Sequence, residues 1–208
     1  SAGNFIPSNT SYTWPLPTAS ASGLNGLAAS TGDQANINAS LTNTSNTAID
    51  AIYLITPKTG ACAGPAFTLT LTVTPRPVIS DKTKATCSNS IFTFTPTNGT
   101  DGIVPLNTRY TWSAPAPVSN ISGLAGGANQ NNFSANLVNA TNAAIAVEYT
   151  IATTNNGCDG SSFKINLTVN PTPLVHARSV AICSGTSFDQ LPTNGTNGGD
   201  GKSPIFKI

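Results

Sequence analysis

Few residues in this sequence have the chemistry of a catalytic group. His176 is the only histidine, so a Ser-His-Asp or Cys-His arrangement would have to use it, and it lies beside the proline-rich stretch 171–173. Glycoside hydrolysis needs two carboxyl groups at a defined separation. Glu148 alternates with Val147 and Tyr149, which predicts that it faces solvent on a strand. We therefore expect no catalytic residue and no enzyme activity.

Candidate metal ligands are also scarce. A zinc site typically contains short Cys-x-x-Cys pairs, whereas the cysteines here are 25, 71 and 25 residues apart. Three aspartates in Gly-rich turns offer oxygens of the kind that calcium prefers, but no repeated Asp-x-Asp cluster accompanies them. We expect neither a metal nor another cofactor. The cysteines are Cys62, Cys87, Cys158 and Cys183, and the aspartates are Asp101, Asp159 and Asp200.

Nine Asn-x-Ser/Thr triplets have the pattern of glycan acceptors in a eukaryotic secreted protein. In a chain so rich in Asn, Ser and Thr many such triplets arise by chance, and chance is the interpretation that we favour. The triplets begin at Asn9, Asn38, Asn43, Asn98, Asn120, Asn132, Asn139, Asn166 and Asn194.

The composition excludes several classes of protein. Among 208 residues only eight are acidic and nine are basic, with a net charge of +1, and typical proteins have about 25% charged residues. Without a basic cluster, the electrostatic footprint of a nucleic-acid-binding protein is missing. No apolar run approaches the roughly 18 residues that span a bilayer. No signal peptide begins at Ser1, so for an exported protein we expect processing or truncation upstream.

The chain repeats itself with a period of about 96 residues, which is its strongest internal signal. The motif Tyr12-Thr-Trp14 recurs as Tyr110-Thr-Trp112 at an offset of 98, so the repeat also contains small length changes of the kind tolerated in turns. The segments that match at an offset of 96 are Cys62 through Phe67 with Cys158 through Phe163, Cys87-Ser with Cys183-Ser, and Phe92 with Phe188.

The phase of the repeat predicts three domains or parts of domains. Residues 78–173 form a complete repeat, residues 1–77 form a partial repeat that lacks its first strands, and residues 174–208 begin a third repeat. Pro171 and Pro173 stiffen the link to the next repeat. Beyond Thr196 the sequence departs from the repeat pattern.

The complete repeat has the pattern of an all-β, antiparallel, immunoglobulin-like sandwich. Apolar and polar residues alternate with a period of two, and turn signals such as Asn98-Gly99, Gly126-Gly127 and Asn156-Gly157 separate the segments. We expect strands near 78–87, 91–96, 108–113, 117–122, 132–139, 145–153 and 162–169. The residues expected to face the core are Phe92, Phe94, Tyr110, Trp112, Ile145, Val147, Tyr149, Ile151, Phe163, Ile165, Leu167 and Val169.

At these motifs the chain resembles the PKD-like, immunoglobulin-like repeats of giant cell-surface adhesins of the Bacteroidota, including those of gliding motility. The resembling segments are Cys87-Ser, Phe92 through Gly99, Tyr110-Thr-Trp112-Ser, Gly157-Cys-Asp-Gly160 and Phe163 through Pro171. The resemblance implies export through the outer membrane, commonly by type IX secretion, and a place on the outside of the bacterial cell. It implies no fixed catalytic or ligand-binding motif.

In an exported protein we expect the cysteines to be oxidised where a partner is within reach. Cys87 and Cys158 of one repeat are one candidate pair. In the expected strand order, however, Cys87 ends the first strand at one end of the sandwich, whereas Cys158 lies in the last hairpin at the other end. The alternative joins the first-strand cysteine of each repeat to the last-hairpin cysteine of the next, and free thiols are a third alternative.

Three functions fit these observations. The first is mechanical: stacked sandwiches form a stalk or filament whose partners are neighbouring repeats and, during export, the secretion machinery. The second is a module that binds extracellular polysaccharide or another surface protein. The third is a spacer in a secreted hydrolase. Carbohydrate recognition would need exposed aromatic rings, for which Phe5 and Phe133 are the candidates outside the inward-facing Tyr-Thr-Trp motifs.

Overall fold

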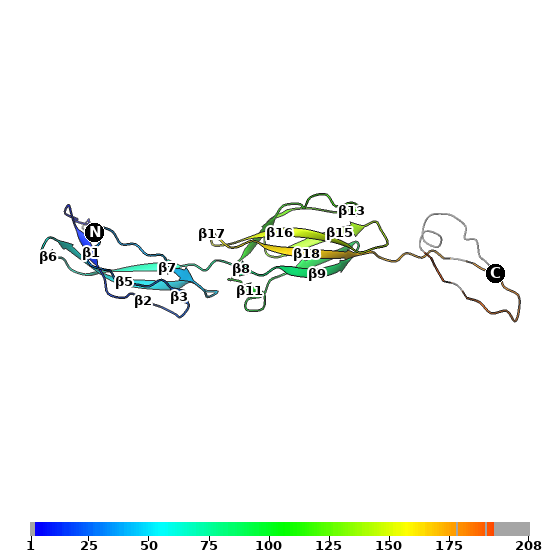
Figure 1. Ribbon diagram of the computed structural model, residues 1–208, viewed down its shortest axis with the longest axis horizontal. Coiled ribbons are helices and arrows are strands. Elements are labelled where there is room, and N and C mark those ends of the chain that lie inside the picture. The colour runs from blue at the N-terminus through cyan, green and yellow to red at the C-terminus, as the bar shows by residue number, and fades with distance from the viewer. Residues whose placement is uncertain (1–2, 178, 190, 194–208) are drawn as a thin grey trace.

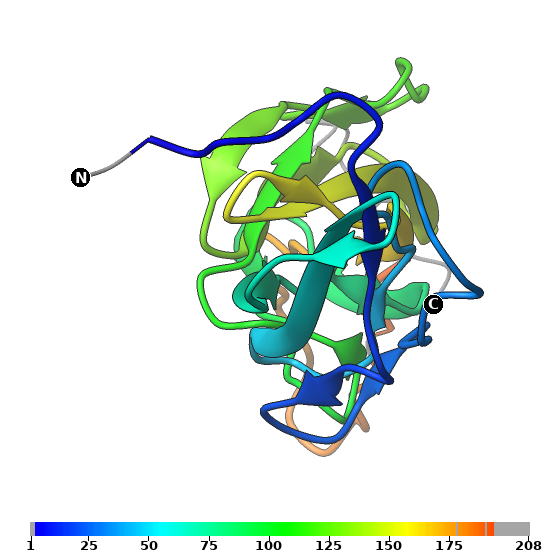
Figure 2. The same cartoon turned by 90° about the vertical axis from the view of Figure 1, so that its left-hand side faces the viewer.

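The computed structural model describes residues 3–177, 179–189 and 191–193, and no helix is found within these ranges. Two β-sandwich repeats lie end to end along the long axis of the molecule (Figure 1). The described C-terminal residues from 174 onward extend beyond the second repeat and form no strand (Figure 1). In the view down the long axis, the first repeat lies in front of the second (Figure 2).

The second repeat has two facing sheets. Their pairs are antiparallel except for β9 and β18, which run parallel, with Ile165 level with Lys82. The larger sheet has the order β14 (Gly127–Gln130), β12 (Arg109–Trp112), β16 (Ile145–Asn155), β18 (Phe163–Asn170) and β9 (Lys82–Cys87), with β17 (Cys158–Asp159) paired to β16. The smaller sheet has the order β10 (Ser90–Phe94), β15 (Phe133–Asn139) and β13 (Ile121–Ser122). A short pair, β8 (Val78–Ile79) with β11 (Gly102–Ile103), lies beside them.

The first repeat is built around one long strand, β5 (Ile49–Thr59). This strand pairs with β1 (Ser11–Thr13), β2 (Thr18–Ala19), β6 (Cys62–Ala63) and β7 (Phe67–Val73). On the opposite side only a two-residue pair remains, β3 (Leu24–Asn25) with β4 (Thr42–Asn43). Strand pairs equivalent to β9–β18 and β10–β15 are therefore absent from the described part of this repeat.

The core of the second repeat lies between the two sheets, as the alternation along its strands requires. Phe133 is fully buried, and its ring centroid is 5.0 Å from that of Trp112 and 4.9 Å from that of Tyr149. Burial, together with the nearby Asp101 carboxylate, raises the pKa of Tyr110 to about 12. Of the residues expected to face inward, Phe92, Phe94 and Ile145 are half-buried. The rest are buried: Tyr110, Trp112, Val147, Tyr149, Ile151, Phe163, Ile165, Leu167 and Val169.

Three sequence-based expectations about strands are wrong in detail. The single strand expected at 78–87 is two strands, β8 and β9, because the chain changes partner at Ser80 and Asp81. The strand expected at 117–122 shrinks to Ile121–Ser122. The loop expected at Gly126-Gly127 ends at Gly126, and Gly127 begins β14 beside β12, a strand that was not expected. A Cβ atom at Gly127 would collide with the Trp112 ring, so glycine is needed here for close approach.

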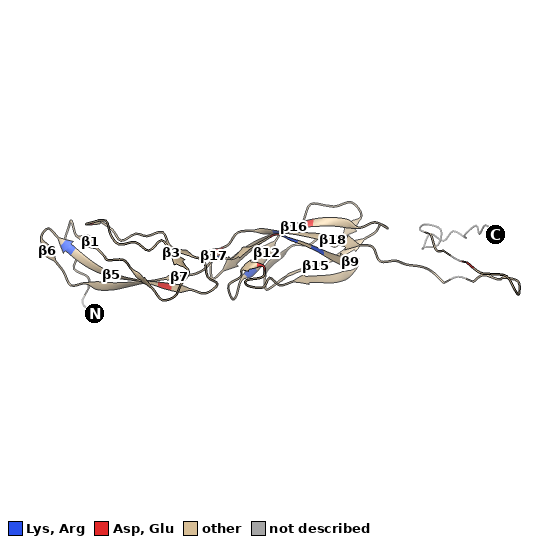
Figure 3. Cartoon of the chain, turned by 60° about the horizontal axis from the view of Figure 1, so that its bottom comes forward, with Lys and Arg blue, Asp and Glu red and all other residues tan. Residues whose placement is uncertain are grey.

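Charged residues are few and lie at scattered positions along the strands of both repeats (Figure 3). Within the described ranges, no helix has the length and apolar character needed to cross a membrane.

Candidate functional site

The junction between the two repeats is a built contact rather than a free linker. Pro75 and Pro77 are buried, and the amide of Ser161 donates a hydrogen bond to the Pro77 carbonyl oxygen at 3.1 Å. A Cβ atom at Gly160 would collide with that same oxygen. The linker therefore docks on the hairpin end of the second repeat, near β17, and Gly160 provides the space for it.

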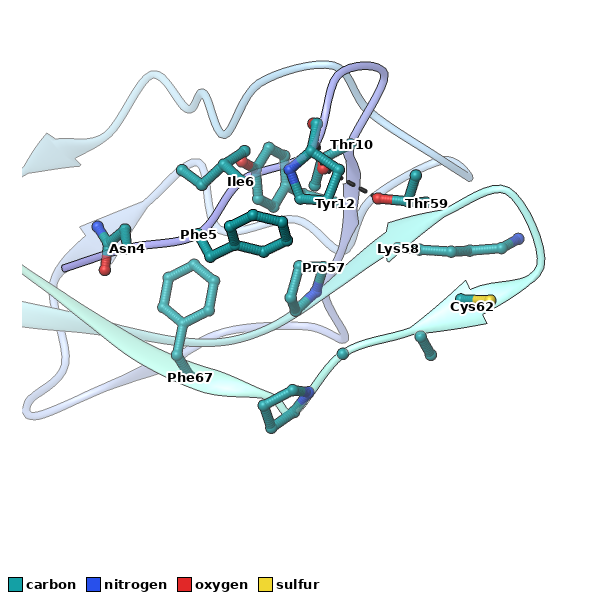
Figure 4. A pocket seen from close by; sticks show the side chains of 14 residues that line it. Asn4, Phe5, Ile6, Thr10, Tyr12, Pro57, Lys58, Thr59, Cys62 and Phe67 are labelled. Carbon is teal, nitrogen blue, oxygen red and sulfur yellow. Dashed lines mark hydrogen bonds between the residues drawn. The ribbon is translucent and has the colours of Figure 1, made fainter. Parts of the chain in front are cut away.

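The same end of the first repeat is open. A pocket of about 600 Å³ lies there (Figure 4). An added Cβ at Gly64, the counterpart of Gly160, would meet only Pro57 within 4 Å, its Cγ at 3.1 Å and its carbonyl oxygen at 3.7 Å. The Phe5 and Phe67 side chains both line this pocket, and 91% and 42% of their surfaces are exposed. Thus the surface that receives a linker in the second repeat is uncovered in the first.

The side chains considered for catalysis are far from forming a site. Glu148 is exposed on β16, where its carboxylate accepts a hydrogen bond from Lys164 Nζ at 2.9 Å. This contact raises the pKa of Lys164. His176 is exposed in the segment beyond the second repeat. Glu148 therefore faces solvent, as predicted, and the structure gives it a surface ion pair.

The aspartates considered for calcium do not converge either. Asp101 forms an ion pair with Lys82 at 2.8 Å and accepts a hydrogen bond from the Thr97 amide at 2.7 Å, so it closes a turn. The hydrogen bond from Lys82 is the main reason that the pKa of Asp101 is lowered, and the Thr97 amide adds to it. Asp159 is exposed on β17, and Asp200 lies outside the described residues. Across the described part of the chain, no group of three or more His, Cys, Asp or Glu side chains is arranged to hold a metal ion.

The four cysteines are free. Cys87 is level with Asn170 in the β9–β18 pair, whereas Cys158 is level with Asn155 at the other end of β16. The 11 residues of β16 separate these two levels, which corresponds to about 36 Å at roughly 3.3 Å per residue. A disulfide needs Cα atoms within about 7 Å. This geometry disfavours a Cys87–Cys158 bond, and pairing between repeats stays a prediction for these two cysteines and for Cys62 and Cys183.

One of the two aromatic residues proposed as exposed stacking platforms does not lie at the surface. Phe133 is fully buried at the centre of the second core, because it points inward at the start of β15. Trp14 and Trp112 are each 7% exposed. Phe5 alone of the proposed platforms is exposed.

A pair of structural asparagines was missed by sequence reasoning. The Asn139 side chain donates to the carbonyl oxygens of Ala143 at 2.7 Å and Val169 at 2.9 Å, and accepts from the Thr141 amide at 2.9 Å. Asn43 makes the equivalent bonds in the first repeat. Both side chains are at least nine-tenths buried. Their Asn-x-Ser/Thr triplets recur at an offset of 96, as do those at Asn98 and Asn194, and this recurrence is the sequence signal that could have indicated a structural role.

Comparison with known families agrees with this architecture. The family model of the PKD-like domain matches residues 4–77 and again residues 84–173. The chain therefore belongs to the PKD-like domain family and contains two tandem members of it. No curated protein matches the chain.

Proposed function

We propose that this chain is a non-catalytic repeat segment of a long secreted cell-surface adhesin or filament, in which it acts as a stalk. The observation that carries this proposal is the junction, where Pro75 and Pro77 of the linker are buried and the Pro77 carbonyl oxygen accepts a hydrogen bond from the Ser161 amide of the second repeat. A docked, proline-rich link resists bending better than a free Gly/Ser linker does. Such an arrangement transmits force and keeps its length.

The dimensions suit a spacer. The longest strand of each repeat, β5 or β16, has 11 residues, so each repeat adds about 36 Å of reach at roughly 3.3 Å per residue. The sparse charge also suits this role, because a surface with few ion pairs is insensitive to changes of salt.

The setting that we propose is the outer surface of a bacterial cell in the Bacteroidota, reached by type IX secretion. Its partners there are the neighbouring repeats and the secretion machinery, with polysaccharide or surface proteins as targets of the whole adhesin. Adhesion or gliding motility is the process that such a stalk would serve. The resemblance described above supports this setting.

Small-angle X-ray scattering tests whether the two repeats form a rigid rod. The chain is measured at concentrations low enough for it to be monomeric. We expect a rod-like distance distribution that fits two docked repeats. Replacing Pro75 and Pro77 by glycine frees the junction and broadens the distribution. The matched control replaces Pro171 and Pro173, which are not buried, and should leave the two-repeat dimension unchanged. A compact particle, or an unchanged curve after the Pro75 and Pro77 substitutions, would contradict a rigid stalk.

Two other functions are a module that binds polysaccharide or a surface protein, and a spacer in a secreted hydrolase. The exposed Phe5 side chain beside the pocket is the observation in favour of a binding module. Glycan-array screening of the chain and of the Phe5→Ala variant tests the first of these. Binding that is lost in Phe5→Ala would favour the module over the stalk.

The cysteines provide a further test of tandem stacking. We propose that Cys87 pairs with the last-hairpin cysteine of the following repeat under oxidising conditions, since both lie at the junction end of their repeats. Non-reducing peptide mapping of a longer natural array checks this pairing. A peptide that links Cys87 to Cys158 of the same chain would show that the strand order is wrong.

A further inference from the structure

The outer face of β5 in the first repeat carries exposed apolar side chains. Ile52 and Leu54 are 39% and 53% exposed, although the residues that alternate with them point inward and are buried. Leu16, in the segment that joins β1 to β2, is 65% exposed. Both β1 and β2 pair with β5, so this segment lies along the same face. We define the apolar patch as Leu16, Ile52 and Leu54.

The corresponding face of the second repeat is also open, but it is not apolar. Glu148, Thr150 and Ala114 occupy the three positions of the apolar patch, at offsets of 96 and 98. All three are exposed and line one shallow hollow, which supports the placement of the patch on one face. Because a complete repeat leaves this face uncovered, further strands of a longer chain would not bury the apolar patch.

The second repeat has an ion pair at the centre of this face. Lys164 Nζ donates a hydrogen bond to the Glu148 carboxylate at 2.9 Å, whereas the first repeat has Thr68 and Ile52 at these positions. Packing a protein surface against Glu148 and Lys164 would remove two charges from water, which is costly. Packing one against the apolar patch buries apolar area, which is favourable. This face is therefore suited to association in the first repeat and unsuited to it in the second.

The charges of the first-repeat face lie at its two ends. Asp50 and Lys58 alternate in phase with Leu54 at equal distances from it along β5, about 13 Å at roughly 3.3 Å per residue. Asp50 accepts a hydrogen bond from Thr72 Oγ1 at 2.7 Å, and Lys58 is 3.3 Å from Asp33. The strand positions between these ends, and those paired with them, are uncharged and rich in threonine: Thr13, Thr18, Thr56, Thr68 and Thr70.

Opposite charges at equal distances from one residue make the face complementary to itself. We propose that it binds the same face of a second copy, with the two β5 strands antiparallel about a two-fold axis at the level of Leu54. Each Leu54 then meets its equivalent, and Asp50 of each copy lies towards Lys58 of the other. Parallel β5 strands would instead bring like charges together. The Lys58 ammonium has three donors, so it can bind this Asp50 and keep Asp33.

Such a contact is lateral. The strand β5 runs along the long axis of the molecule (Figure 1), so both ends of each repeat stay free for neighbours in the same chain. The contact uses one surface twice and therefore closes at a dimer. One sheet face is a small interface, so we expect weak, concentration-dependent association. If the chain is a stalk, two stalks would lie side by side, but the inference does not depend on that role.

The double variant Ile52→Glu with Thr68→Lys tests the face. It gives the first repeat the ion pair of the second, which tolerates these residues at the same strand positions, so the fold should be kept. The matched control, Glu148→Lys with Lys164→Glu, reverses the existing pair on the second repeat. Circular dichroism melting checks the fold of every variant.

Sedimentation equilibrium of the full chain under reducing conditions gives the result. We expect a reversible equilibrium between the 21.1 kDa chain and its dimer for the wild type and the control. The double variant should dimerise about tenfold more weakly or not at all, because its face buries charges. A wild type that stays monomeric at the highest soluble concentration, or that grows beyond a dimer, would overturn the proposal. A double variant that dimerises like the wild type would overturn it too.

Two further variants test the two-fold axis. Asp50→Lys or Lys58→Asp alone places like charges opposite each other at both ends of the contact, and each should weaken dimerisation by about tenfold. An equimolar mixture of the two variants brings opposite charges together again, so it should dimerise more tightly than either variant alone. A mixture that associates no better than its components would contradict the antiparallel arrangement.

Discussion

The two repeats share one fold, but they differ in how completely neighbouring strands bury the side chains of their main sheet. Tyr53 of β5 and Tyr149 of β16 are each 1% exposed, so the central strand is buried equally well in both. The next strand differs: Phe67 of β7 is 42% exposed, whereas Phe163 of β18 is 1% exposed. The central strand is covered mostly by residues that precede it in sequence, such as Trp14 against Tyr53 and Phe133 against Tyr149. Burial of its neighbour depends on β9 and β10.

This difference shows what β9 and β10 contribute to the core of a PKD-like repeat. The strands β9 and β10 begin the second repeat and complete both of its sheets, and a repeat without them retains its central strand but loses one side of its core. The effect of a substitution should therefore depend on the repeat that carries it. The indole N–H signals of Trp14 and Trp112 in a urea titration report on each repeat separately.

The largest difference between the repeats in the loss of unfolding free energy is expected for a matched pair of leucines. Leu167→Ala removes a fully buried side chain and should lower the free energy of unfolding of the second repeat by about 2–5 kcal/mol. Leu71→Ala removes a side chain that is 37% exposed and should cost the first repeat about 1 kcal/mol. Equal losses of unfolding free energy in the two repeats of a monomeric chain would mean that β7 is buried to the same extent as β18.

The two buried asparagines should behave alike, because neither depends on β9. Asn139→Ala and Asn43→Ala each leave buried carbonyl oxygens without a donor, at a cost of about 1–3 kcal/mol. Each loss should appear only in the urea transition of its own repeat. The exposed substitution Asn142→Ala serves as control. A loss of stability in one repeat but not in the other would show that the two buried asparagines are not equivalent.

A smaller, pH-dependent effect is expected from Asp101, which has an ion pair with Lys82 that the first repeat lacks in its described residues. The pKa of Asp101 is lowered in the folded state, mainly by the hydrogen bond from Lys82. Its contribution is therefore fully present above the ordinary value of 3.8 and is lost as the pH falls through the lower folded pKa. Asp101→Asn should destabilise the second repeat by no more than about 1 kcal/mol at neutral pH.

Urea titrations of wild type and Asp101→Asn at neutral pH and below the folded pKa check this effect. The gap between the two proteins should close at the lower pH. A gap that persists there would assign the loss to the turn that Asp101 closes rather than to its charge.

The smallest effect is expected at Glu148. It is exposed and paired with Lys164 at the surface, where salt screens the interaction and the ordering of two long side chains opposes it. Glu148→Gln should leave the urea midpoints of both repeats unchanged. A clear shift of the second-repeat transition would show that this pair supports the sheet.

Sequence reasoning identified what depends on local pattern. The alternation Phe163 through Val169 predicts one buried face, and the strand carries it as expected. The division of 78–87 into β8 and β9 was not predictable, because it results from pairing with two different distant strands. Phe133 was misjudged although Phe133, Ala135 and Leu137 alternate on the buried face of its strand. The Trp112 and Tyr149 rings that bury it come from the facing sheet, which is distant in sequence.

The sites at the ends of the repeats were partly predictable. The placement of Cys87 and Cys158 at opposite ends follows from the strand order alone. The role of Gly160 could not be predicted, because a glycine in a turn does not indicate in the sequence that the linker packs against it. Comparison with Gly64 reveals that role, since the same glycine is covered in one repeat and open in the other.

Amide hydrogen exchange along β7 and β18, measured residue by residue on the monomeric chain, shows directly whether the two strands differ in pairing. We expect β7 to alternate between protected amides, bonded to β5, and fast-exchanging amides that face its open edge. Along β18, which is paired on both sides, we expect protection at every residue from Ile165 to Val169. Uniform protection along β7 in the monomer would contradict this expectation, because that result would mean that the first repeat has no open edge.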